Sequence, residues 1–121
     1  MIPTEHQEQA AFVRWFRIQF PAVRLFAVPN GAFLAGSIGQ RAAQMRKLKA
    51  EGLDAGVPDI CIPAWDFWIE FKRIKGGVVS DEQREWHQYL RDLGDTVIVA
   101  KGADDAMQQV RSWRAKNART S

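Results

Sequence analysis

The chain has 121 residues, of which 46% are apolar and 26% charged, and this composition is typical of a single globular domain. Lysine and arginine number 17 against 14 acids, and this mild basic excess allows nucleic-acid binding without establishing it. The single cysteine, Cys61, excludes an internal disulfide and a cysteine-built zinc site, and its isoleucine neighbours predict a buried, inert thiol. We expect a cytoplasmic protein, because the sequence shows neither a secretory signal nor an apolar run of ~20 residues.

The first part of the chain predicts a helix, a strand and a second helix. Thr4 is a good N-cap for the first helix, and Pro21 ends it. Residues 22–31 predict a strand that closes at the turn pair Asn30–Gly31. Residues 37–52 predict a second, basic helix that ends in a glycine.

The second part begins with two short apolar strands, VPDICI and DFWIEFKRI, which a four-residue loop at positions 63–66 joins as a hairpin. After a KGG turn, Ser80 caps a third helix. The last strand and helix lie within residues 95–116, and residues 116–121 form an expected frayed tail. The order helix, strand, helix, two strands, helix, strand, helix predicts an α/β fold, a mixed β-sheet flanked by helices.

The hairpin brings charged side chains onto one face of the predicted sheet. With a four-residue loop, the two strands pair so that Asp59 lies opposite Glu70, and directly opposed residues share a face. Lys72 is two residues beyond Glu70 and therefore points to the same side. The register is essential to this prediction, because a slip of one residue would separate the groups.

Two carboxylates and an ammonium group at one place favour a site for a hard divalent cation. Facing carboxylates repel each other unless a cation lies between them, and Mg²⁺ binds carboxylate and phosphate oxygens while keeping several waters. Lys72 can position a water and stabilise charge on a phosphate. The set predicts a phosphodiester hydrolase. The alternative is that Asp59 is a turn residue after Pro58, and that Glu70 and Lys72 form an exposed cross-strand pair.

The motif residues, Pro58–Asp59 followed by Glu70-Phe71-Lys72, are similar to the PD-(D/E)xK nuclease signature. The longer stretches TEHQEQAAFVRWF, LKAEGLDAGVPDI and WIEFKRIKGGVVSDEQREWHQYLRDLG resemble the small stand-alone VRR-NUC (virus-type replication-repair nuclease) proteins, which bacteriophages often carry. The resemblance covers about residues 4–110 and implies a restriction-endonuclease-like fold.

The same resemblance implies a role for each motif residue. Asp59, Glu70 and the backbone carbonyl of Phe71 would bind Mg²⁺, for which Mn²⁺ should substitute because it accepts the same ligands. Lys72 would be the catalytic lysine.

Two further groups would complete the implied site. Glu5 ranks first as the first-helix glutamate, because with Gln9 it matches the family's E-x-x-x-Q pattern, and Glu8 is the alternative. Glu5 could instead be a first-turn acid favoured by the helix dipole. Gln83 matches the family's glutamine after the hairpin, yet it is also the expected capping-box partner of Ser80, and the two roles can conflict.

Basic side chains outside the motif are candidates for contacts with a DNA backbone, and a solvated helix face is the alternative for those on the second helix. They are Arg41, Lys47, Lys49 and Lys75. His6 and His87 have no ligand spacing and are expected at the surface. Trp65, in the hairpin loop, is the tryptophan expected to meet DNA or another subunit.

The resemblance implies a metal-dependent, structure-specific DNA endonuclease, foremost a homodimeric Holliday-junction resolvase. A chain of 121 residues leaves no room for a separate sequence-reading domain, and two symmetric nicks need the two sites that a C2 dimer supplies. The alternatives are a nuclease for flaps or other branched DNA, a non-catalytic DNA-binding module, and a small interaction domain with an accidental motif. The expected location is a bacterial host cell, with a phage or prophage as the source of the gene.

Overall fold

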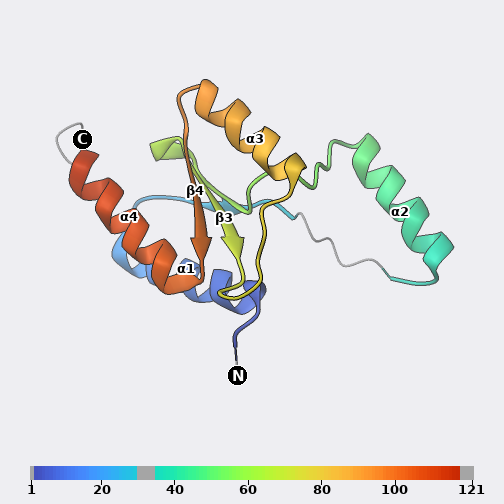
Figure 1. Cartoon of the computed structure of the whole chain (residues 1–121), viewed down its shortest axis with the longest axis horizontal. Coiled ribbons are helices and arrows are strands. Elements are labelled where there is room, and N and C mark those ends of the chain that lie inside the picture. Colours follow the sequence, from blue (N-terminus) through green and yellow to red (C-terminus); the bar gives the residue numbers. More distant parts are fainter. Residues whose placement is uncertain (1, 30–34, 118–121) are drawn as a thin grey trace.

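A computed structural model of the chain describes residues 2–29 and 35–117, and Figure 1 shows the arrangement of their helices and strands. The elements are α1 (Glu5–Gln19), β1 (Phe26–Ala27), α2 (Ile38–Ala50), β2 (Ile60–Ile62), β3 (Phe67–Lys72), α3 (Asp81–Asp92), β4 (Thr96–Lys101) and α4 (Ala103–Asn117). Their order confirms the predicted α/β class. The predicted turn pair Asn30–Gly31 and residues 118–121 of the predicted tail lie outside the described residues.

The strands form a mixed sheet in the order β1-β2-β3-β4, antiparallel in the first two pairs and parallel between β3 and β4. β1 is much shorter than the predicted strand. Beyond the ladder, the Val28 amide still donates to the carbonyl of Asp59 (2.8 Å).

The hairpin has the register that a four-residue loop predicts, with Ile62 opposite Phe67. A short 3₁₀ turn, Pro63–Trp65, and a left-handed residue close the loop. The same pairing, continued outward by one step beyond the ladder, brings Asp59 opposite Glu70.

Alternation along β3 separates the apolar core from a polar face. The core-facing side chains pack beneath α1 and α4, and they are Phe67, Ile69 and Phe71. The ring centroids of Phe12 and Phe71 are 5.6 Å apart, and those of Phe67 and Trp113 are 5.0 Å apart. The intervening residues Trp68, Glu70 and Lys72 point to the opposite face, which α3 covers. Charged residues can therefore occupy an apolar strand, because this second face belongs to a polar site.

Trp65 lies in an aromatic cluster and is not a free surface residue. Its ring centroid is 5.4 Å from that of Phe16, 5.1 Å from that of Phe20 and 5.2 Å from that of Trp113. Trp65 is thus half-buried where the loop folds back over the core formed by α1 and α4, and its contact with DNA or another subunit stays a prediction.

Candidate active site

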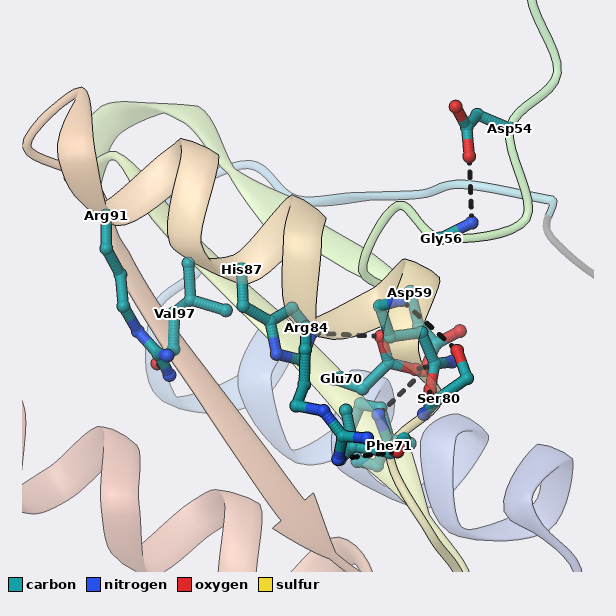
Figure 2. A network of polar contacts seen from close by, with 12 residues as sticks. Asp54, Gly56, Asp59, Glu70, Phe71, Ser80, Arg84, His87, Arg91 and Val97 are labelled. Carbon is teal, nitrogen blue, oxygen red and sulfur yellow. Dashed lines mark hydrogen bonds and ion pairs between the residues drawn. The ribbon is translucent and has the colours of Figure 1, made fainter.

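Asp59 immediately precedes β2, and its side chain reaches across to β3. The Oδ2 atom accepts a hydrogen bond from the Phe71 amide at 2.7 Å. The loop before Asp59 packs tightly against α3. A Cβ added at Gly56 would lie only 2.6 Å from Cδ1 of Trp86. The Gly56 amide in turn donates to Oδ1 of Asp54 at 3.0 Å (Figure 2). The bond from the Phe71 amide holds the Asp59 carboxylate against β3, so Asp59 is more than a local turn residue.

Glu70 is a buried carboxylate, only 2% exposed, on the face of β3 that α3 covers. Burial is the largest cause that raises its pKa from the usual 4.5 to about 9, and repulsion from Asp59 and a side-chain hydrogen bond with Asp59 add to it. Lys72 lowers this pKa and Glu5 raises it further. In the metal-free chain Glu70 therefore carries a proton at neutral pH, and the alternative of an exposed cross-strand pair with Lys72 does not fit Glu70.

His87 is 3% exposed, so its predicted surface position is wrong. Its Nε2 atom lies 3.3 Å from Oε1 of Glu70, and Figure 2 shows the ring on α3 directed toward that carboxylate. Burial is the main cause that lowers the pKa of His87, and Arg91 and Lys72 lower it further, so the ring is neutral near pH 7. A signal was present in the sequence, because His87 lies one turn after Gln83 and three residues before the apolar Leu90. His6 is exposed, as predicted.

Gln83 performs both of the roles that we expected to conflict. Its Oε1 accepts from the Ser80 amide at 2.9 Å and thereby completes the capping box of α3. Its Nε2 donates to Oε2 of Glu70 at 3.1 Å. The two ends of one amide serve the helix and the carboxylate at the same time, so the conflict does not arise.

Lys72 is the last residue of β3 and is half-buried. Among the described residues, the ion pairs within 4.0 Å do not include its ammonium group. The following KGG turn lies close beneath it, since a Cβ at Gly77 would be 2.9 Å from Cβ of Lys72. The side chain is therefore anchored at its base, while its charge remains available and acts on Glu70.

The structure separates the two first-helix glutamates. Glu5 is exposed in the first turn of α1, and its charge acts on Glu70. Glu8, one turn later, accepts a hydrogen bond through Oε2 from the Ala103 amide at the start of α4. Glu8 is thus a cap for α4, and of the two glutamates it is Glu5 whose charge acts on Glu70.

Among solved structures, one described as a "VRR_NUC domain protein" superposes with a TM-score of 0.72, covering 91% of this chain and 87% of that chain at 23% sequence identity. The chain has the fold of a VRR_NUC domain protein. This superposition confirms the VRR-NUC resemblance at the level of the fold, and with it the predicted restriction-endonuclease-like architecture. The sequence matches no family model, and it matches no curated protein.

Within this VRR_NUC fold, the carboxylate pair fits a hard divalent cation. No group of three or more His, Cys, Asp or Glu side chains that could hold a metal ion occurs in residues 2–29 and 35–117. Asp59 and Glu70 nevertheless offer oxygen donors alone, and a proton now offsets part of their mutual repulsion. A cation that keeps several waters, such as Mg²⁺, needs few protein ligands and could replace that proton.

The predicted DNA contacts fall in two places. Arg41, Lys47 and Lys49 are exposed on α2, a helix without buried residues that stands apart from the sheet in Figure 1. Lys75 is exposed in the turn after β3, three residues beyond Lys72. The structure thus keeps Lys75 near the end of β3 and places the α2 cations away from the sheet.

None of the described helices combines the length and apolar character that a membrane crossing needs.

Proposed function

We propose that the chain is a metal-dependent, structure-specific DNA endonuclease. The observation that carries this proposal is the convergence of Asp59 and Glu70, with the charge of Lys72 acting on the pair. The fold supports it, because a solved structure with this fold is described as a "VRR_NUC domain protein". Hydrolysis of a phosphodiester requires stabilisation of negative charge on phosphate oxygens, and this face of β3 collects the groups for that task.

Asp59, Glu70 and the backbone carbonyl of Phe71 would hold Mg²⁺, or Mn²⁺ in its place, and Glu5 would complete the site. Bound there, the ion would neutralise phosphate charge and lower the pKa of a coordinated water. The bond from the Phe71 amide fixes the direction of the Asp59 carboxylate before any ion arrives.

Lys72 is the group that would face the reacting phosphate. Its ammonium would orient the attacking water and stabilise the charge that grows on the phosphate oxygens. In the reaction, the water oxygen forms a new bond to phosphorus, one phosphorus–oxygen bond to deoxyribose breaks, and a proton is transferred to the departing oxygen. Gln83 would act indirectly, by holding Glu70 in place through its hydrogen bond.

For the substrate, we propose a four-way DNA junction cut by a homodimer. Two symmetric nicks require two sites, and a C2 dimer supplies them. α2 carries basic residues with none buried, which suits contact with a phosphate backbone rather than with base edges. This part of the proposal also follows the resemblance of the sequence to stand-alone VRR-NUC proteins.

The test is cleavage of labelled four-way junction, flap and linear duplex DNA in Mg²⁺, in Mn²⁺ and in EDTA, with the mass of the protein measured by sedimentation. We expect a dimer that makes paired, metal-dependent cuts on the junction. Cuts mainly on flaps would retain the nuclease and refute the junction preference. Junction binding without cleavage in either metal would instead support the non-catalytic DNA-binding module.

A further inference from the structure

Two nitrogen atoms from a single face of α3 contact the two oxygens of the Glu70 carboxylate. Gln83 Nε2 lies 3.1 Å from Oε2, and His87 Nε2 lies 3.3 Å from Oε1. Gln83 and His87 are four residues apart, and this spacing places both side chains on one side of the helix. Each oxygen of the carboxylate thus meets one nitrogen atom from α3, the amide of Gln83 or the ring of His87.

The chemistry of each group fixes the direction of these bonds. An ionised carboxylate only accepts hydrogen bonds, so the Nε2 atom of His87 must carry the proton in that state. Gln83 has no freedom to turn its amide around, because its carbonyl oxygen is already engaged by the Ser80 amide at 2.9 Å. Gln83 is therefore set as a donor before a cation binds, and the Nε2 atom of His87 donates once Glu70 is ionised.

His87 has no other evident task in this site. It is almost fully buried, on a helix whose outer residues are largely polar and exposed. A buried ring nitrogen requires a partner, and the partner recorded for Nε2 is Glu70. The Nε2 contact points at the same carboxylate that Asp59 and Lys72 influence.

We propose that His87 is a positioning residue, which together with Gln83 fixes the plane of the Glu70 carboxylate so that it binds a divalent cation. The inference rests on the proposed metal-dependent function. Groups that orient a metal ligand typically contribute about 10–100-fold to metal affinity. Loss of the His87 donor should weaken Mn²⁺ binding by a factor in this range.

Three substitutions of His87 separate the effect of its hydrogen-bond donor from the effect of its volume. His87→Leu fills the space without a donor. His87→Gln places an amide nitrogen the same number of bonds from Cβ as Nε2. His87→Asn places its nitrogen one bond closer, where it replaces Nδ1 and does not reach Glu70. Melting of each variant in EDTA establishes that it is folded.

The measurement is the Mn²⁺ dissociation constant, obtained from the electron paramagnetic resonance signal of free Mn²⁺ without DNA. We expect His87→Leu and His87→Asn to raise this constant about 10–100-fold, and His87→Gln to return it close to the wild-type value. Equal affinity in wild type and His87→Leu, or a His87→Gln variant no better than His87→Leu, would overturn the positioning role. Asp59→Asn separates a failure of the His87 role from a failure of the metal site itself. If wild type and Asp59→Asn both fail to bind Mn²⁺, the proposed metal site is wrong, and so is the role of His87.

Discussion

Glu70 should make the stability of the metal-free chain fall as the pH rises. Its pKa is about 9 in the folded chain and 4.5 in its ordinary state, so between these values folding takes up one proton. A raised pKa contributes stability that is complete below pH 4.5 and is lost progressively up to pH 9. Each pH unit in this window costs about 1.4 kcal/mol, so a change from pH 5 to pH 8 should cost about 4 kcal/mol.

Urea unfolding in EDTA at several pH values, for wild type and Glu70→Gln, isolates this contribution, because other titrating groups are common to both proteins. The free energy of unfolding of wild type, minus that of the variant, should fall by about 4 kcal/mol from pH 5 to pH 8. That is a large part of the 5–15 kcal/mol typical of a domain. Curves that stay parallel to within about 1 kcal/mol would refute the raised pKa of Glu70. Saturating Mg²⁺ should flatten the wild-type curve, since the cation would replace that proton.

Three further predictions concern neighbouring residues. Asp59→Asn should lower the pKa of Glu70 by removing the repulsion, and carbon NMR of the Glu70 carboxyl would follow the change. Glu8→Gln should cost about 1 kcal/mol of stability through the weakened cap of α4, whereas Glu5→Gln should leave urea unfolding nearly unchanged and weaken Mn²⁺ binding; the reverse pattern would exchange their roles. Gln83→Glu should keep the helix cap, because a carboxylate oxygen still accepts from Ser80, but abolish cleavage by repelling Glu70; full activity would contradict the contact.

The register of the hairpin was predictable because two strong local rules agree. A loop of four residues sets the pairing, and the strict alternation of a strand then decides which side chains share a face. The position of Asp59 opposite Glu70 could be predicted from the sequence without any tertiary information. The same rules overestimated β1, because the length of an edge strand depends on its partner, and β2 has only three residues.

Two features of the site could not be predicted from local sequence rules. His87 lies on the inner face of α3, but that face covers a polar site, so its inner positions carry Gln and His where a core helix would carry apolar residues. Glu5 and Glu8 stand on successive turns of α1, and spacing alone cannot rank them. The contact that separates them is the bond of Glu8 to the Ala103 amide, a partner 95 residues away in the sequence.

The central claim, that this face of β3 hydrolyses phosphodiesters with Lys72, is tested most directly by single-turnover cleavage of a four-way junction in Mg²⁺. Wild type would be compared with Lys72→Ala and with Lys101→Ala, a matched loss of charge at the position paired with Lys72 on the adjacent strand. We predict that Lys72→Ala lowers the cleavage rate by about 10²-fold or more, with junction binding retained, and that Lys101→Ala cleaves at nearly the wild-type rate. Equal rates for wild type and Lys72→Ala, or cleavage that persists in EDTA, would contradict the account.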